Sequence, residues 1–375
     1  MSPSAGGRTP PEGPGRSASA APAPQTSRPW SLAPPAWQGA AWHRWWQLVQ
    51  ADRLGHAYLL VGPQGTGRRP FAEAALALLL CAAPGVQGAC GACRSCRLLT
   101  AGTHPDQHVL VPEEAGTGIR IDAIRGMAER LQRHGHFGAR RGVIIDPAEA
   151  VNLQAANSLL KLLEEPPSGV LFLLIVERER RLPITLRSRC QRLTLASPAP
   201  GEAQEWLRAQ GISAAAATAA LALAPGRPRQ ALTLAAEAPA LLAALRDDLA
   251  ALLARRADLV AVANRWQAHP ELDLLLRWLL TQVRAALRAQ LLPAPQDAGP
   301  TDDILRQLCN VPAARLFAYH DELQQAATES QAGMNRQLLM ERLLLRWMSG
   351  FASEPVPPGV ATGLAWAANI SPQEG

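Results

Sequence analysis

Residues 62–69 form a glycine-rich loop between a short apolar run and a helical pattern. Gly62 and Gly67 have the spacing of the motif G-x-x-x-x-G-K-[ST], in which backbone amides cradle phosphates, the lysine reaches them and the hydroxyl holds Mg²⁺. Arg68 stands at the lysine position and Arg69 at the hydroxyl position. A guanidinium carries charge, but it does not replace a compact ammonium, and it cannot act as a metal-binding hydroxyl. The loop therefore predicts a nucleotide-binding frame that lacks the side chains for hydrolysis.

The segments around this loop predict an α/β domain. Residues 56–61 form a short apolar run, and residues 142–146 and 170–176 do not alternate in polarity, which is typical of parallel strands that are covered on both faces. Helical patterns follow the first two strands, over residues 71–80 and over residues 153–165, where two prolines end the second helix. Strands that alternate with helices indicate an open parallel sheet.

The rest of the chain divides by composition. Residues 1–36 are rich in proline, glycine and alanine and predict a disordered extension, because they cannot bury enough apolar surface to offset ordering entropy. The α/β domain then occupies residues 37–197. Residues 198–236 predict a small helical unit, and the amphipathic leucine patterns of residues 237–350 predict a helical bundle packed by those leucines. Residues 351–375 are expected to form a loose tail.

Composition sets limits on the location and on the partners of the chain. Its 375 residues, of which 48% are hydrophobic and 18% charged, indicate a globular protein with more than one domain. No apolar run reaches the roughly 18 residues that a membrane span needs, and no secretory signal is visible. We therefore expect a cytoplasmic protein without a membrane partner. The net charge of +6 permits contact with nucleic acid without indicating a dedicated nucleic-acid binder.

Four cysteines, with the spacing C-x8-C-x2-C-x2-C, suggest a metal site in a reducing compartment. Four thiolates suit a closed tetrahedral zinc site, which would be structural because no ligand position remains for water. The same spacing opens the iron–sulfur pattern, but Thr100 stands where that pattern would place its fourth cysteine. Unligated thiols are the third interpretation. The remaining cysteines, Cys190 and Cys309, are isolated and are interpreted as packing residues.

Acidic residues near the predicted nucleotide site have two interpretations. Asp146 ends a buried strand, where an acidic residue often holds Mg²⁺ in nucleotide-hydrolysing proteins. It could equally be an acidic cap in a strand-to-helix turn. A ring-forming ATPase would have a glutamate next, but the next residue is Pro147, and Glu149 lies two positions further on.

Basic residues follow the last long apolar strand, in the sequence Leu-Arg-Ser-Arg-Cys of residues 186–190. One interpretation is a solvated basic loop. The other is that one of these arginines reaches a nucleotide bound by a neighbouring subunit. The pair His104 and Asp106 is separated by a proline, which favours an extended turn, and no nucleophile accompanies it. We find no catalytic triad.

Several of these segments together resemble one family. The matching stretches are residues 56–60, the cysteine cluster, residues 101–106, residues 157–167 with their Leu-Glu-Glu-Pro-Pro sequence, and residues 186–190. Over roughly residues 42–198, the chain is similar to the delta-prime family of bacterial DNA polymerase III clamp-loader subunits, which are AAA+ proteins. The only lysine of the chain, Lys161, falls inside one of these stretches.

The gamma/tau ATPases of the same complex share the cysteine cluster and the Glu-Glu-Pro-Pro and Ser-Arg-Cys sequences. They carry an intact Lys-Thr after the loop and an Asp-Glu pair, where this chain has Arg68, Arg69 and Pro147. A polar nucleotide sensor is also expected near Val176, which is apolar. The resemblance therefore implies a subunit without ATPase activity of its own and without productive ATP or Mg²⁺ binding. Its vestigial phosphate loop would be formed by Gly62, Gly65 and Gly67.

The resemblance also implies an architecture and partners. The AAA+ module would include a structural zinc module at residues 81–96, with Cys81, Cys90, Cys93 and Cys96 as ligands, and would precede a lid and a collar domain. The collar would join gamma/tau and delta subunits in a five-membered ring. Arg189 would act in trans on ATP bound by the adjacent gamma/tau subunit. The complex loads the sliding clamp onto primed DNA, as a component of a DNA-directed DNA polymerase (nucleotidyltransferase) holoenzyme.

Two alternatives belong to other functional classes. One is a divergent clamp-loader ATPase of the gamma/tau type that uses Arg68 and a shifted metal site. The other is a zinc-dependent DNA-binding or adaptor module formed around the cysteines. The second alternative has little support, because Arg94 and Arg97 near the cysteines have no aromatic neighbours for stacking on single strands.

Overall fold

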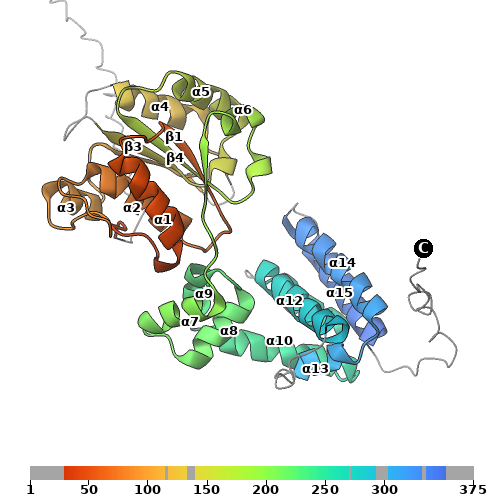
Figure 1. Ribbon diagram of the computed structural model, residues 1–375. Coiled ribbons are helices and arrows are strands. Elements are labelled where there is room, and N and C mark those ends of the chain that lie inside the picture. The colour runs from red at the N-terminus through yellow and green to blue at the C-terminus, as the bar shows by residue number, and fades with distance from the viewer. Residues whose placement is uncertain are drawn as a thin grey trace, which may run out of the picture. The chain divides into compact units, whose positions relative to one another are not determined.

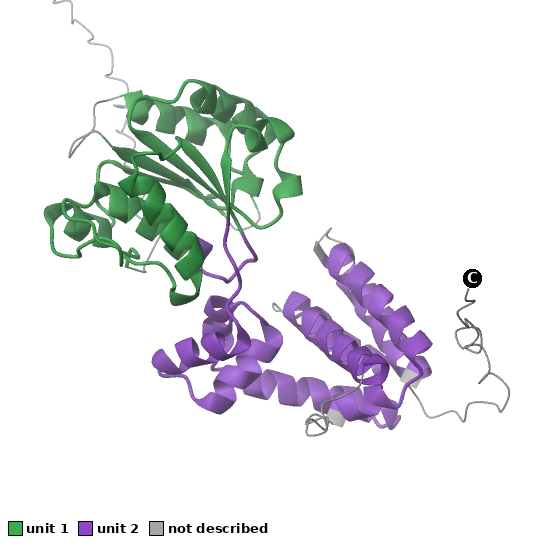
Figure 2. Cartoon of the chain, in the orientation of Figure 1, with its two compact units in different colours: residues 1–61, 69–193 green, residues 62–68, 194–375 purple. Residues whose placement is uncertain are grey.

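The structure is a computed structural model of the chain. It describes residues 29–114, 117–132, 140–269, 272–292, 303–331 and 335–351. The chain divides into two compact units, coloured separately in Figure 2. The first unit comprises residues up to 61 together with 69–193, and the second comprises residues 62–68 together with those from 194 onward.

The first unit is built on a five-stranded sheet with the order β2-β3-β4-β1-β5. Its strands are β1 (Ala57–Val61), β2 (Gln107–Leu110), β3 (Arg141–Ile145), β4 (Val170–Val176) and β5 (Gln191–Thr194). The pairs β1–β4, β3–β4 and β2–β3 are parallel, with Tyr58 opposite Leu173 and Val143 opposite Phe172. Every residue of β1, β3 and β4 is buried. This confirms the predicted parallel sheet and explains why these strands do not alternate in polarity.

Helices cover both faces of this sheet (Figure 1). They are α1 (Gly39–Gln50), α2 (Arg68–Leu80), α3 (Arg94–Thr100), α4 (Ile121–Gln132), α5 (Leu153–Glu164) and α6 (Ile184–Arg187). Short 3₁₀ turns span Ala36–Gln38, Ala148–Ala150 and Glu179–Arg181. On one face, α4 and α5 pack on a core that includes Leu59 and Phe172. On the other face, α1 places Trp45 edge-on against Tyr58, with their ring centroids 4.9 Å apart.

The packed part of this unit begins earlier than the composition suggested. Trp30 is buried, and its indole N–H donates to the carbonyl of Glu73 on α2 at 3.0 Å. The backbone N–H of Ser31 donates to the Glu73 carboxylate at 3.1 Å. Residues 29–36 therefore belong with the first unit. The buried indole of Trp30 and its hydrogen bond attach this segment to α2, although its composition is rich in proline. The rest of the predicted extension, residues 1–28, lies outside the described residues, as does the predicted tail beyond residue 351.

The second unit is helical. Its helices are α7 (Pro200–Ala209), α8 (Ala214–Leu223), α9 (Pro228–Leu234), α10 (Ala238–Leu253), α11 (Leu259–Gln267), α12 (Leu272–Leu291), α13 (Asp303–Cys309), α14 (Ala313–Gln331) and α15 (Arg336–Phe351). The predicted boundary between lid and collar, at residue 236, falls in the break between α9 and α10. One hydrophobic core nevertheless runs across it, from Leu207 on α7 to Trp347 on α15.

Two polar side chains, the Trp347 indole and the Asp248 carboxylate, connect helices of this unit. The indole N–H of Trp347 donates to the carbonyl of Leu249 at 3.2 Å and ties α15 to α10. The buried carboxylate of Asp248 accepts from the Trp266 indole at 2.8 Å and from Arg265 at 3.0 Å. Within the described residues, no helix is long and apolar enough to cross a membrane.

Candidate functional site

The glycine loop connects the end of β1 to the start of α2, as the motif requires. Gly65 and Gly67 adopt φ values of +81° and +88°, which residues with a Cβ rarely adopt. Gly62 leaves no room for a side chain, because an added Cβ would lie 2.6 Å from the carbonyl oxygen of Leu195. The hydroxyl of Thr66 donates to the carbonyl of Pro63 at 2.8 Å and so closes the turn from inside.

The loop is covered by the start of α9. The backbone N–H of Arg229 donates to the carbonyl of Gly65 at 3.1 Å. A Cβ on Gly65 would lie 2.9 Å from the Cβ of Arg227 and 3.0 Å from the Cβ of Gln230. These contacts explain why residues 62–68 group with the second unit, and they place protein atoms directly beside Gly65.

The two arginines that follow the loop differ in their surroundings. Arg68 is buried, with 9% of its surface exposed. The guanidinium of Arg69 lies between two carboxylates, with Nη1 3.2 Å from Asp146 Oδ2 and Nε 2.9 Å from Glu73 Oε1. In hydrolysing P-loop proteins, Mg²⁺ is held by the hydroxyl at the position of Arg69 and by an acidic residue at a strand end. Here the residues at these two positions bind each other.

Sequence reasoning had not found Glu73, the third member of this cluster. It lies one helical turn after Arg69 and is 3% exposed. Its two carboxylate oxygens accept from the Arg69 side chain and from the Ser31 backbone. An i,i+4 pair of opposite charge on an apolar helix was the available signal.

Other acidic and sensor positions do not contribute to this cluster. Glu149, which stands after Pro147, accepts from the backbone N–H groups of Glu177 and Arg178 at 2.5 Å and 2.8 Å. It is therefore engaged at the end of β4. Val176, where a polar sensor was expected, is fully buried in the core.

The four cysteines converge at the other end of α2. Cys81 follows that helix, Cys93 is the N-cap of α3, and Cys96 lies in the first turn of α3. All four sulfurs lie within 4.8 Å of one another, including that of Cys90. The Sγ–Sγ distances are 4.0 Å for Cys81–Cys93, 4.0 Å for Cys90–Cys96 and 3.7 Å for Cys81–Cys96. A tetrahedral ion with Zn–S bonds of about 2.3 Å separates its sulfurs by about 3.8 Å.

Backbone amides donate hydrogen bonds to these sulfurs. The N–H of Cys90 donates to Cys81 Sγ at 3.2 Å, and the N–H of Cys96 donates to Cys93 Sγ at 3.4 Å. Desolvation opposes ionisation of Cys93, but hydrogen bonds from the Ala82 and Cys96 amides hold its pKa at about 6. The four-sulfur set fits one structural zinc ion and leaves no open coordination position.

His104 and Asp106 connect this module to β2. Since the N–H of Asp106 donates to His104 Nδ1 at 3.2 Å, the imidazole proton resides on Nε2, which bonds to the hydroxyl of Ser95 at 2.8 Å. Burial lowers the pKa of His104, which keeps the ring neutral. The histidine therefore fastens α3 to the start of β2, in agreement with an extended turn and not with a catalytic pair.

Arg189 lies just after α6 and is 36% exposed. Its Nη2 is 2.6 Å from Glu164 Oε1 at the end of α5. Its Nη1 donates to the Thr185 carbonyl at 3.0 Å and contacts the Ser188 hydroxyl at 3.4 Å. The arginine is thus held by its own subunit and remains accessible. Desolvation raises the pKa of the neighbouring Cys190 to about 12, which fits a packing thiol.

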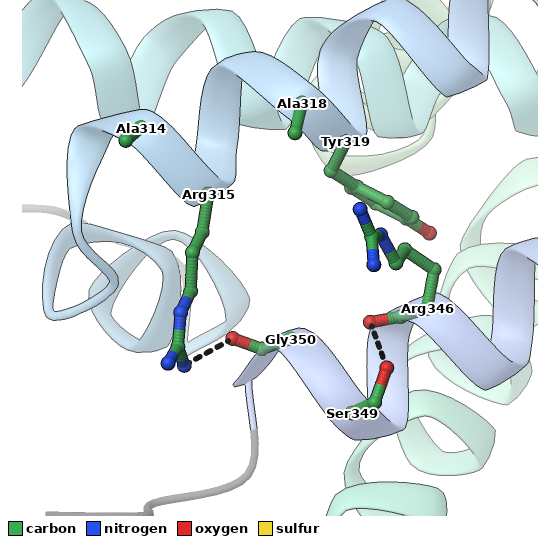
Figure 3. A pocket seen from close by; sticks show the side chains of 7 residues that line it. All are labelled: Ala314, Arg315, Ala318, Tyr319, Arg346, Ser349 and Gly350. Carbon is green, nitrogen blue, oxygen red and sulfur yellow. Dashed lines mark hydrogen bonds between the residues drawn. The ribbon is translucent and has the colours of Figure 1, made fainter. Parts of the chain in front are cut away.

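A separate hollow lies between α14 and α15 (Figure 3). It has a volume of about 400 Å³, and its lining includes Arg315 and Arg346. Arg315 donates to the carbonyl of Gly350 at 3.3 Å, and Arg346 pairs with Glu322 at 3.0 Å. Both charged groups are therefore engaged within the unit, and none of the residues predicted as functional lines this hollow.

Comparison with known proteins identifies the family of the chain. The model of the family "DNA polymerase III, delta subunit" matches residues 37–199, and its C-terminal counterpart matches residues 240–349. DNA polymerase III subunit delta' of Pseudomonas aeruginosa is 37% identical over 84% of this chain and 97% of its own length. The chain belongs to the delta-prime family of DNA polymerase III subunits. The Escherichia coli member of the family is 35% identical over 79% of this chain and 90% of its own length.

Two further proteins to which the chain is similar lie outside the delta-prime family. The tau subunit of Bacillus subtilis DNA polymerase III is 30% identical over 37% of this chain and 24% of its own length. The solved structure of a gamma subunit-related protein from Thermotoga maritima aligns with a TM-score of 0.38 and 17% identity. That alignment covers 82% of this chain and 99% of the solved one.

Proposed function

We propose that this chain is a non-hydrolysing subunit of the DNA polymerase III clamp loader. The observation that carries the proposal is the contact between Arg69 and Asp146. These residues stand at the two positions that hold Mg²⁺ in hydrolysing P-loop proteins. A guanidinium bound there gives Asp146 a permanent positive partner, so a metal ion would have to displace a covalently tethered cation.

Three further observations support the same conclusion. Pro147 provides no side chain to orient an attacking water, and Glu149 is engaged by the backbone at the end of β4. Val176 is apolar and buried where a polar sensor was expected. Residues at the start of α9 lie against Gly65 in the phosphate loop. Each observation concerns a different part of the nucleotide site.

The proposed chemical contribution of the chain is Arg189, which would act on ATP bound by an adjacent gamma/tau subunit. Its partial exposure and its position in a short turn support delivery of the guanidinium to another chain. An arginine supplied in this way raises hydrolysis rates by roughly 10³–10⁵ in other systems. A subunit without turnover of its own could therefore control hydrolysis by its neighbour.

The remaining parts of the proposal concern assembly. The helical second unit would join gamma/tau and delta subunits in a five-membered ring, and the cysteine module would carry a structural zinc ion. The complex would load the sliding clamp onto primed DNA in the cytoplasm, as part of the DNA-directed DNA polymerase holoenzyme. Membership of the delta-prime family supports these assignments.

The decisive experiment uses the purified full chain alone. ATPase activity is measured with and without primed DNA, and nucleotide binding is measured by calorimetry with and without Mg²⁺. We expect no turnover and no Mg²⁺-dependent binding. Turnover that is abolished by Arg68→Ala would overturn the proposal in favour of a divergent ATPase of the gamma/tau type.

A further inference from the structure

The end of α5 and the turn after α6 are joined by a close ion pair. Arg189 Nη2 and Glu164 Oε1 are 2.6 Å apart. Glu164 is the last residue of α5, and Arg189 follows the C-cap of α6, Ser188. The contact therefore links a long helix to a helix of only four residues, which alone offers little rigidity.

The helix that carries Glu164 is firmly anchored. Its N-cap, Asn152, accepts from the backbone N–H of Ala155 at 2.8 Å. Leu159 and Leu163 are buried in the core that packs against one face of the sheet. Because Glu164 directly follows Leu163, its carboxylate is attached to a well-fixed backbone. A support on a rigid element positions a functional side chain better than a loop alone.

The contacts on Arg189 leave its Nε available. Of its three side-chain nitrogens, Nη1 donates to the Thr185 carbonyl and the Ser188 hydroxyl, and Nη2 forms the ion pair with Glu164. Among the described residues, Nε of Arg189 donates no hydrogen bond. Nε and Nη2 lie on one edge of the guanidinium plane, and such an edge can bind two phosphate oxygens at once.

Stability alone does not account for this pair. Both side chains are substantially exposed, 36% for Arg189 and 49% for Glu164. Exposed ion pairs contribute little to folding. An exposed arginine has many rotamers, however, and restricting them before a ligand arrives lowers the cost of binding that ligand. The pair therefore acts mainly by restricting the orientation of the Arg189 side chain.

We propose that Glu164 is a positioning residue for Arg189, holding its free edge ready for the phosphates of a nucleoside triphosphate on the neighbouring subunit. This inference rests on the proposed role of Arg189 in trans. Glu164 itself does not contact the nucleotide; it acts through the guanidinium. A phosphate would add contacts on Nε and Nη2 without breaking the pair.

The test uses the reconstituted clamp-loader complex with the variants Glu164→Gln, Glu164→Asp, Arg189→Ala and Glu164→Gln/Arg189→Ala. Glu165→Gln is the matched control, since it removes the same charge at the next residue. We expect Glu164→Gln to lower the ATP turnover of the complex, with KM unchanged, by part of the loss that Arg189→Ala causes. We also expect Glu164→Asp to recover part of the rate, and Glu165→Gln to have no effect. In the Arg189→Ala background, Glu164→Gln should change nothing further.

The outcomes separate this inference from the proposed function. If Arg189→Ala lowers the rate but Glu164→Gln leaves it unchanged or raises it, the positioning role is wrong and the role of Arg189 stands. An equal loss from Glu164→Gln in the Arg189→Ala background also overturns the inference, because Glu164 then acts independently. If Arg189→Ala has no effect, the role of Arg189 itself fails. Equal melting temperatures of the variants show that folding is not the cause.

Discussion

The guanidinium of Arg69 lies 3.2 Å from the carboxylate of Asp146, across the gap between the start of α2 and the end of β3. The same guanidinium binds Glu73, which in turn holds the segment before α1 through Ser31. One substituted loop residue thus connects three parts of the first unit. Arg69 therefore has a structural role in addition to replacing the metal-binding hydroxyl of the motif.

The first prediction concerns this contact. Arg69→Ala should lower the free energy of unfolding by about 1–3 kcal/mol, because it leaves two poorly exposed carboxylates without their common partner. Urea unfolding of the full chain measures the change. Arg125→Ala is the matched control, because Arg125 and Asp122 form an exposed pair and should contribute less than about 1 kcal/mol. Equal effects of the two substitutions would contradict the prediction.

The second prediction concerns the cysteine cluster. Metal analysis of the purified chain should find one zinc ion per chain, and Cys96→Ser should abolish it and destabilise the first unit by several kcal/mol (about 3 or more). Cys309→Ser, outside the cluster, should retain the metal. Iron and sulfide with a visible absorption band would show an iron–sulfur cluster and contradict the zinc assignment.

The third prediction concerns Arg189 in the assembled complex. Arg189→Ala should leave assembly intact, as judged by gel filtration, and should remove turnover at the one nucleotide site that it serves. The rate per complex should therefore fall while the other sites continue. Arg192→Ala is a suitable control, because Arg192 is also exposed and is paired with Glu179. An unchanged ATPase rate for Arg189→Ala would refute the assignment.

The fourth prediction concerns pH. The pKa of His108 on β2 is lowered to about 4, mainly by desolvation and to a smaller extent by repulsion from Arg130. Burial also lowers the pKa of His104. Because the unfolded chain binds these protons more readily, near the ordinary histidine pKa of about 6.5, acid favours unfolding. Stability should be fully present above about pH 6.5 and should decline as the pH falls toward 4.

Thermal unfolding across that interval tests the fourth prediction. His108→Gln should reduce the dependence of the melting temperature on pH, since it removes one group that takes up a proton on unfolding. His43→Gln, at an exposed position of α1, serves as the control. If His108→Gln and the unmodified chain show the same dependence of melting temperature on pH between pH 4 and pH 6.5, the explanation from desolvated histidines is wrong.

Long apolar runs made most of the α/β fold predictable. Residues 170–176 form β4 with the expected bounds, and the helix expected over residues 153–165 ends one residue earlier. The strands β2 and β5 were missed. Each has only four residues, and β5 is exposed along most of its length, so neither shows a continuous apolar pattern.

The candidate sites were also predictable only where their residues are close together in the sequence. The glycine spacing and the cysteine spacing are local, so sequence alone indicated a phosphate-type loop and a metal site. The contact of Glu73 with Ser31 depends on a partner that is distant in the chain, and the role of Glu164 depends on a partner on another element, so no local pattern indicates either. The burial of Trp30 was missed for the same reason, because its partner Glu73 lies on α2.

Sequence alone thus determined which residue types of the nucleotide-hydrolysing motifs are missing, because positions 68, 69 and 147 carry neither the lysine, nor the hydroxyl, nor an acidic residue. Only the tertiary structure decided what takes their place. It brings Arg69 to Asp146 across 77 positions of the chain, and Glu164 to Arg189 from a different helix. Charges interact through space over a few ångströms, and the fold alone sets those distances.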